Sequence, residues 1–215
     1  MSLILYYHPL SSFCWKVLTA LYEYEIPFEP RLINLGDPAS RAELERHWPF
    51  NKFPVIEDTA AKRVLPESSI IIEYLGLSSG KTGLLPRDPE QALPVRLADR
   101  FYDLQVHMPM QRVVFDRLRP AGKQDPLGVE QARATLKIAY GLIERDAASR
   151  AWAAGDTFSM ADCAAAPALY YADRVQPLRS EYPHAAAYLR RLEERPSFAR
   201  VLREAEPYFA MFPTG

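Results

Sequence analysis

Residues 8–17, His8-Pro-Leu-Ser-Ser-Phe-Cys-Trp-Lys-Val17, place two hydroxyls and a thiol between an apolar run and a helical pattern. Residues 3–7, Leu-Ile-Leu-Tyr-Tyr, predict a buried first strand, and the apolar spacing over 13–24 predicts a helix. Ser11 and Ser12 therefore open that helix. Unpaired backbone N–H groups and the positive end of the helix dipole favour a carboxylate, a phosphate or a thiolate there. A serine at a strand-to-helix junction also serves as an ordinary helix cap, so this stretch alone leaves both roles open.

The composition has no charged or apolar extreme. Its 215 residues carry 26 basic and 27 acidic side chains, so no overall field draws the chain to nucleic acid or to a membrane. No apolar run approaches the roughly 18 residues that span a bilayer, and the N-terminus lacks the pattern of a secretory signal. We therefore expect a cytoplasmic protein with neither a nucleic-acid nor a membrane partner. The two cysteines and four histidines lack ligand-like spacing, so we expect no metal site.

The first 79 residues mix strand and helix patterns. After the first strand and helix, the patterns predict a strand at 28–35, a short helix at 40–48, strands at 54–57 and 63–65, and a helix that starts at 67–69. The order βαβ followed by ββα predicts one four-stranded mixed sheet covered by helices, because a hairpin extends the parallel pair antiparallel. Residues 1–79 are thus expected to form an α/β domain.

The rest of the chain is predicted to be all-helical. Residues 80–89 contain two glycines and two prolines, which is typical of a linker. The domain 90–215 is expected to hold about five helices, at 90–118, 126–148, 159–173, 184–194 and 197–205. Pro109 lies inside the first of these, so that helix should kink or split near residues 107–110.

Two further motifs in the first domain could recognise a small peptide. Phe53-Pro54 enters the third strand, where a cis bond would present the Phe53 N–H and C=O to an extended peptide. Glu67 and Ser68 begin a helix whose N-terminus can bind a carboxylate, while Glu67 offers its charge to an ammonium group. Lys52 could reach a terminal carboxylate, although a lysine beside a turn is often only solvated. Together with a thiol at the two serines, these groups fit a γ-glutamyl tripeptide with a central cysteine.

These motifs occur in an order that resembles the glutathione S-transferase family. The segments that carry the resemblance are 11–17, 51–55, Glu67-Ser68 with 71–75, the Leu-Leu-Pro linker and the helix-capping segment 155–162, and they cover essentially the whole chain. The resemblance implies a thioredoxin-like first domain with an all-α second domain, and glutathione as cosubstrate. The opening motif is most similar to the zeta-like and theta-like serine classes, in which the residue that matches Ser11 donates a hydrogen bond to the glutathione sulfur. We expect Ser12 to cap the helix, which favours Ser11 as the activating residue and leaves Ser12 as the alternative.

Cys14 is a rival to Ser11, because Ser11-x-x-Cys14 is a Cys-x-x-Cys motif without its first cysteine. The nucleophilic cysteine of a thioredoxin-like fold is the first one, so we expect Cys14 to be a buried structural residue. An oxidoreductase that uses a protein mixed disulfide is correspondingly disfavoured.

The resemblance also implies where the second substrate and a second subunit bind. Tyr102, His107, Met110 and Phe115 are candidates for the wall of a pocket for a small hydrophobic electrophile, and three aromatic residues, Tyr208, Phe209 and Phe212, could form a lid. A homodimer is expected, in which Asp99 or Asp103 reaches the glutathione of the neighbouring subunit. The sequence does not choose between these two aspartates.

The leading prediction is an enzyme that activates glutathione as a thiolate for attack on a small electrophile. Glutathione-dependent isomerisation or dehalogenation of small acids is an alternative, weakened because Phe13 and Lys16 stand where zeta-type sequences have cysteine and arginine. A non-catalytic protein-interaction module is a second alternative, since a fold does not by itself decide function.

Overall fold

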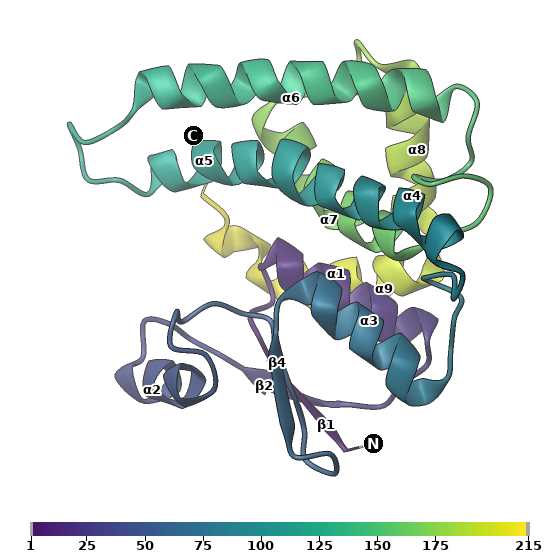
Figure 1. Ribbon diagram of the computed structural model, residues 1–215. Helices are drawn as coiled ribbons and strands as arrows, with labels where there is room; N and C mark the ends of the chain where they lie inside the picture. Colours follow the sequence, from purple (N-terminus) through teal and green to yellow (C-terminus); the bar gives the residue numbers. More distant parts are fainter. Residues whose placement is uncertain (1, 214–215) are drawn as a thin grey trace.

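The computed structural model describes residues 2–213, and the N-terminal part of the chain has the predicted βαβ-ββα order (Figure 1). The strands form one sheet in the order β2-β1-β3-β4, with β1 and β2 parallel and the other neighbours antiparallel. The predicted four-stranded mixed sheet is therefore confirmed. The elements of this part are β1 (Leu3–Tyr7), α1 (Ser12–Glu23), β2 (Glu29–Leu32), α2 (Pro38–His47), β3 (Val55–Asp58), β4 (Arg63–Pro66) and α3 (Ser68–Ser79).

The two faces of the sheet pack differently. Because successive side chains of a strand point to opposite faces, Leu5 joins the main core while Tyr6 joins a smaller cluster with Leu44 of α2. Helices α1 and α3 lie between the sheet and the helical domain, whereas α2 stands apart from them (Figure 1). The sheet thus directs the N-terminus of α1 toward the junction of the two domains.

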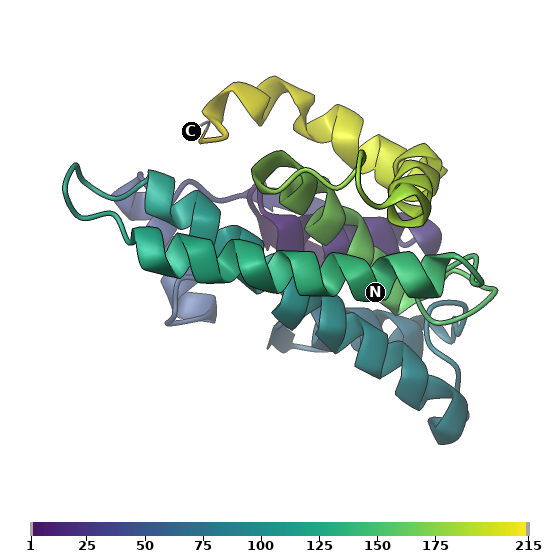
Figure 2. The ribbon, with the colours of Figure 1, turned by 90° about the horizontal axis from the view of Figure 1, so that it is seen from above.

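The second part of the chain is helical, as predicted. Helix α7 is buried along nearly its whole length because it packs against α1, η1 and α4 of the described chain. It lies in the middle of the helical domain, with α6 running along one side (Figure 2). The elements are α4 (Pro89–Phe101), η1 (Tyr102–His107), α5 (Met108–Arg117), α6 (Pro126–Ala147), α7 (Met160–Val175), α8 (Pro183–Glu194), α9 (Pro196–Ala205) and η2 (Glu206–Met211).

The interruption expected at Pro109 takes the form of a π-helix. Proline has no backbone N–H and its ring clashes with the carbonyl four residues earlier, so a regular turn cannot continue there. The chain widens into the π-helix η1 just before it, and the Met108 N–H bonds to the Asp103 carbonyl. Helix α5 then starts at Met108. Pro167, by contrast, is accommodated inside a continuous α7.

Helix α1 is buried around most of its circumference because it lies between the sheet and α7. Trp15 is completely buried, and its ring lies among Tyr170 and Tyr171 of α7, Phe198 of α9 and Phe209 of η2. One aromatic side chain thus joins α1 to three elements of the helical domain. Among residues 2–213, no helix has the length and hydropathy to cross a membrane.

Candidate functional site

The N-terminus of α1 is capped by Ser11. Ser12 is the first helical residue, so the extended residue before it is Ser11, and the Ser11 Oγ accepts a hydrogen bond from the Cys14 N–H at 3.3 Å. The expectation that Ser12 is the cap is therefore wrong. The cap bond uses a lone pair of the Ser11 oxygen, so the hydroxyl proton stays available for donation to an incoming group.

Ser12 instead contacts the helical domain. The residue is 8% exposed, and its hydroxyl lies 2.5 Å from Nε2 of His107, a residue 95 positions away at the end of η1. The His107 ring also packs against the ring of Phe13, with 4.0 Å between ring centroids. The structure thus brings His107 to the serine pair, as expected of a residue at the domain junction.

His107 is held in its neutral form. Burial, reinforced by the charge of Lys16, lowers the pKa of His107 to about 3. Its Nδ1 is buried without a hydrogen-bond partner among the described residues. A neutral imidazole carries one proton. If that proton is on Nε2, it is donated to Ser12, and the Ser12 proton is free for a ligand.

Cys14 is completely buried, which confirms the structural role expected for it. Burial raises the pKa of its thiol to about 12, although the neighbouring polar groups of Ser11 and His8 act in the opposite direction. Since the thiolate is the reactive form, this thiol is not a nucleophile at neutral pH. The structure gives no support to mixed-disulfide chemistry at Cys14.

The predicted cis bond at Phe53–Pro54 is confirmed. His8 lies beside it, because its ring stacks on Phe53 with 5.7 Å between centroids and its Nδ1 accepts the Leu10 N–H at 3.2 Å. This contact joins the loop that precedes Ser11 to the cis-proline turn. No sequence motif singles out His8, although this residue opens the segment 8–17. Lys52 is exposed beside this turn.

The start of α3 combines an unusual backbone conformation with a buried serine. Glu67 precedes the helix with a positive φ of 71°, and Ser68 is the buried first helical residue. A left-handed backbone is unusual for glutamate and directs the chain sharply into the helix. Glu67 remains exposed while the first N–H groups of α3 follow it.

A buried charge cluster ties α3 to α1 and to the helical domain. Lys16 is 1% exposed and its Nζ lies 2.6 Å from Asp99 Oδ1 and 2.8 Å from Asp103 Oδ2. The same ammonium donates to Ser69 Oγ at 2.8 Å, and Ser69 donates to Asp99 at 2.7 Å. Arg100 covers the cluster and pairs with both carboxylates. The two positive charges thus balance the two negative ones.

The cluster corrects one expectation and fixes one geometry. Asp99 and Asp103 are both buried against Lys16 of their own chain, so neither extends toward a neighbouring subunit as expected. Burial raises the pKa of Asp103, while the charge of Lys16 lowers it. Since Ser69 follows Ser68 directly, the cluster fixes the start of α3 relative to α1.

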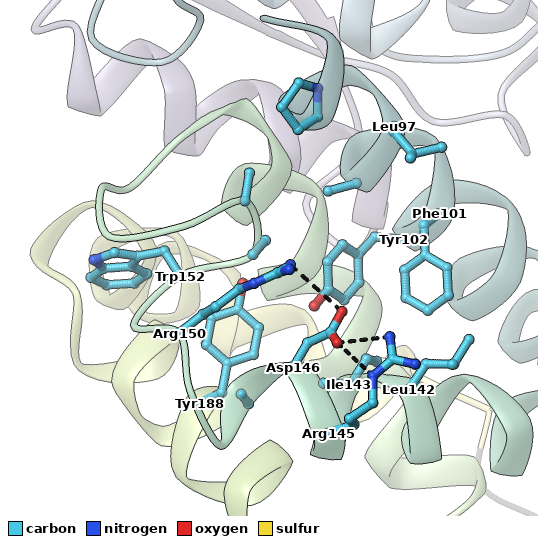
Figure 3. Close-up of a pocket in the computed structure, with 15 residues that line it drawn as sticks. Leu97, Phe101, Tyr102, Leu142, Ile143, Arg145, Asp146, Arg150, Trp152 and Tyr188 are labelled. Atoms are coloured by element: carbon cyan, nitrogen blue, oxygen red, sulfur yellow. Dashed lines mark hydrogen bonds and ion pairs between the residues drawn. The ribbon is translucent and has the colours of Figure 1, made fainter. Parts of the chain in front are cut away.

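Only part of the expected electrophile wall lies near the serines. Met110 is buried one helical turn beyond His107, whereas Phe115 is 55% exposed and lies outside the buried face of α5. Tyr102 is buried as expected but turns away from the serine pair. It lines a separate cavity of about 570 Å³ between α4 and α6, where it faces Tyr188 (Figure 3). The structure therefore places Tyr102 in this cavity and not beside the serine pair.

The cavity between α4 and α6 is largely apolar, with charged side chains on one side. Leu97 and Phe101 of α4 face it, and Asp146 of α6 pairs there with Arg145 and Arg150 (Figure 3). Among residues 2–213, no group of three or more His, Cys, Asp or Glu side chains could hold a metal ion. The serine pair, the cis-proline turn and the start of α3 therefore remain the candidate site.

Comparison with known proteins shows the family to which the chain belongs. Residues 5–80 match the model for the N-terminal domain of glutathione S-transferases, and residues 126–191 match the model for the C-terminal domain. FtsZ-localized protein A of Caulobacter vibrioides is 30% identical over 96% of this chain and 93% of its own length. The chain belongs to the glutathione S-transferase family.

Two further relatives bear on its chemistry. A glutathione S-transferase of Methylobacterium radiotolerans, solved in complex with glutathione sulfonate, has a TM-score of 0.82 and 29% identity, with 94% of each chain covered. Probable maleylacetoacetate isomerase 2 of Drosophila melanogaster is 27% identical over 95% of this chain and 89% of its own length. The chain is thus similar both to a structure solved with a glutathione analogue and to a relative named as an isomerase.

Proposed function

We propose that this protein is a glutathione transferase that binds glutathione in its N-terminal domain and activates it as a thiolate for attack on a small hydrophobic electrophile. The observation that carries the proposal is that three elements occur together in the first domain. They are the serine pair at the start of α1, the cis Phe53–Pro54 turn and the start of α3 at Ser68. The relative of Methylobacterium radiotolerans, which was solved with glutathione sulfonate, supports this assignment.

Ser11 is the proposed donor to the glutathione sulfur. Lowering a thiol pKa by two units requires about 2.7 kcal/mol. A helix dipole supplies only about 0.3–1 kcal/mol, whereas a hydrogen bond to a charged group adds roughly 1.5–3 kcal/mol. A hydroxyl and the dipole of α1 together reach the required sum. The Ser11 oxygen already accepts the Cys14 N–H, which leaves its proton for the sulfur.

The remaining groups hold the peptide. The Phe53 backbone pairs with the cysteinyl residue of glutathione, and the first N–H groups of α3 with the Ser68 hydroxyl bind the γ-glutamyl carboxylate. Glu67 binds the α-ammonium, and Lys52 reaches the glycyl carboxylate. On the side of the helical domain, the electrophile lies against His107 and Met110. His107 is held there by its contact with Ser12.

The test measures the thiolate absorbance of bound glutathione against pH, after calorimetry establishes binding. The wild type is compared with Ser11→Ala and Ser12→Ala. We expect a depressed thiol pKa in the wild type that returns toward its free value only in Ser11→Ala. A return only in Ser12→Ala would assign activation to the pair Ser12 and His107. Absence of glutathione binding would refute the proposal that the protein is a glutathione-dependent enzyme.

A homodimer is part of the proposal. Helices α4 and α6 carry large apolar side chains that are more than half exposed, among them Leu93, Leu97 and Ile138. A second copy that covers this face would remove them from water. Sedimentation should give a dimer, and Leu97→Glu should give a monomer. A monomeric wild type at micromolar concentration would contradict this part. The cytoplasmic location remains a prediction.

Two other functions remain as alternatives because specific relatives favour them. The likeness to probable maleylacetoacetate isomerase 2 favours glutathione-dependent isomerisation of a small acid. The 30% identity with FtsZ-localized protein A favours a non-catalytic protein-binding module. Calorimetry separates the two classes, since the module needs no glutathione. Product analysis with a cis-unsaturated dicarboxylate then separates isomerisation from conjugation.

A further inference from the structure

We infer that His8 is a positioning residue of the glutathione site, which sets the distance between the Ser11 hydroxyl and the Phe53 backbone. This inference rests on the proposed function and adds a residue to that same site. It starts from the place of His8 in the chain, between the end of β1 and the serine pair that opens α1. The His8 ring is half-buried and lies beside the cis Phe53–Pro54 turn.

Two hydrogen bonds join His8 to the residues that lead into Ser11. The His8 carbonyl accepts the Ser11 N–H at 3.0 Å, which closes a tight turn over residues 8–11. The His8 Nδ1 accepts the Leu10 N–H at 3.2 Å, so the ring is fixed to the same turn. Because Nδ1 is the acceptor, the proton of the neutral ring is on Nε2. Burial lowers the pKa of His8, which keeps the ring neutral and Nδ1 an acceptor at neutral pH.

The other carbonyls of this turn are held by the helices behind it. The Pro9 carbonyl accepts from the Trp15 Nε1 at 2.5 Å, and the Leu10 carbonyl accepts from the Tyr171 hydroxyl at 3.0 Å. These two bonds anchor the turn to α1 and to α7. Neither of them extends to the cis-proline turn, which the His8 ring contacts.

The ring of His8 stacks on the ring of Phe53. The two planes are inclined by 16°, with 5.7 Å between centroids. Stacked rings have a preferred separation and orientation, in contrast to flexible aliphatic side chains. Phe53 in turn packs against the smaller apolar cluster on the α2 side of the sheet, which includes Leu44 and Val55. The stacking therefore fixes the turn that carries Ser11 relative to Phe53.

The spacing between Ser11 and Phe53 matters because both bind the same residue of glutathione. In the proposed complex the Phe53 backbone pairs with the cysteinyl backbone, while Ser11 donates to the cysteinyl sulfur. The short side chain of cysteine fixes how far its sulfur lies from its backbone. A hydrogen bond weakens steeply when its length or angle departs from the optimum, so a shift between the two turns costs the thiolate its donor. His8 thus acts on the thiol pKa through Ser11.

Three substitutions separate the two contacts of the His8 side chain. His8→Phe keeps a ring against Phe53 and removes the acceptor of the Leu10 N–H. His8→Asn removes the ring and keeps an oxygen that accepts from the N–H two residues further on. His8→Ala removes both contacts. His47→Ala is the matched control, because His47 is also half-buried against an aromatic ring, that of Tyr6 at 4.4 Å, but lies at the end of α2.

The experiment measures the thiolate absorbance of bound glutathione against pH for each variant of the full chain. Glutathione is kept at a concentration that saturates each variant by calorimetry, so that a weaker affinity is not mistaken for a smaller thiolate fraction. We expect His8→Ala to raise the thiol pKa by about one unit, since a hydrogen bond to a charged group is worth about one to two units. His8→Phe and His8→Asn should raise it by less, and His47→Ala should leave it unchanged.

A double variant tests whether His8 acts through Ser11. In Ser11→Ala the donor to the sulfur is absent, so the addition of His8→Ala should cause no further rise in the thiol pKa. Additive shifts from the two substitutions would mean that His8 acts on the sulfur independently of Ser11, which would overturn the inference.

The outcomes distinguish this inference from the proposed function. If His8 had a purely structural role, His8→Ala would lower the unfolding free energy in urea but leave the thiol pKa at its wild-type value. That result would overturn the inference and leave the transferase assignment intact. If His8→Ala does not fold, His8→Phe decides by the same criterion. An unchanged thiol pKa in Ser11→Ala would also overturn the inference, whereas absence of glutathione binding by the wild type would refute the proposed function itself.

Discussion

Trp15 and Lys16 are neighbours in α1 and are both fully buried, yet they meet opposite environments. Trp15 lies among aromatic rings of α7, α9 and η2, whereas Lys16 meets two aspartates and a serine from α4, η1 and α3. Apolar contacts are non-directional and scale with buried area, while a buried ion pair requires exact partners. The aromatic contacts of Trp15 therefore hold the two domains together, and the ion pairs of Lys16 fix the start of α3 relative to α1.

The largest effect is expected from Trp15→Ala. Truncation of a fully buried aromatic residue leaves a cavity and costs about 3–5 kcal/mol of unfolding free energy. Urea denaturation measures the loss. The variant also loses the hydrogen bond that the Trp15 Nε1 donates at 2.5 Å to the Pro9 carbonyl, in the loop that precedes Ser11. Trp48→Ala is the control, since Trp48 is only half-buried at the end of α2. Equal losses in the two variants would contradict the role of Trp15 at the junction.

Lys16→Met should cost about 3 kcal/mol at neutral pH, because among the described residues it leaves Arg100 as the one cation that pairs with the two buried carboxylates. It should also weaken glutathione binding, since Ser69 loses a partner next to Ser68. Lys137→Met, at an exposed position of α6, is the control. Unchanged glutathione affinity in a destabilised Lys16→Met would show that the cluster does not position α3.

The same variant has a defined pH dependence. Burial already raises the pKa of Asp103 above its ordinary value, and loss of Lys16 removes the main group that lowers it. The native state then binds a proton more readily than the unfolded state, so the stability of Lys16→Met should rise as the pH falls toward that raised pKa. The wild type should gain less over the same range. Parallel curves for the two proteins would contradict this account.

The effect of pH on stability is expected to have the opposite sign for His107. Because burial lowers its pKa to about 3, it stays neutral in the native state while the unfolded chain protonates it near its ordinary value of 6.5. Stability should therefore fall between pH 6.5 and pH 3, by up to about 1.4 kcal/mol per pH unit. His107→Asn keeps a partner for Ser12 and should flatten this slope, as measured by urea unfolding. Exposed His184→Asn should leave the slope unchanged.

The smallest effect is expected from Ser11→Ala. Loss of the cap bond to the Cys14 N–H should lower the unfolding free energy by about 1 kcal/mol. Thermal unfolding measures this loss without glutathione, so it is separate from the effect on the thiol. Ser180→Ala, in an exposed turn, is the control. A loss no greater than that of the control would mean that the α1 cap contributes nothing to stability.

Local rules in the sequence determined the elements of this protein. The βαβ-ββα order, the helical second half and the helix interruption at Pro109 follow from hydrophobic periodicity and from the missing N–H of proline. The cis Phe53–Pro54 turn and the burial of Cys14 were likewise predictable from motifs that lie within a few residues. The catalytic roles of Ser11 and Ser12 remain predictions that neither the fold nor the contacts test.

Only the tertiary structure decided which groups meet. The contact between Ser12 and His107 joins residues 95 positions apart, and the partners of Lys16 come from three different elements. The contact of Tyr102 in η1 with Tyr188 in α8 likewise joins segments that are distant in the sequence. The physical reason is that periodicity predicts whether a side chain is buried, whereas its neighbours are set by how distant segments pack against one another.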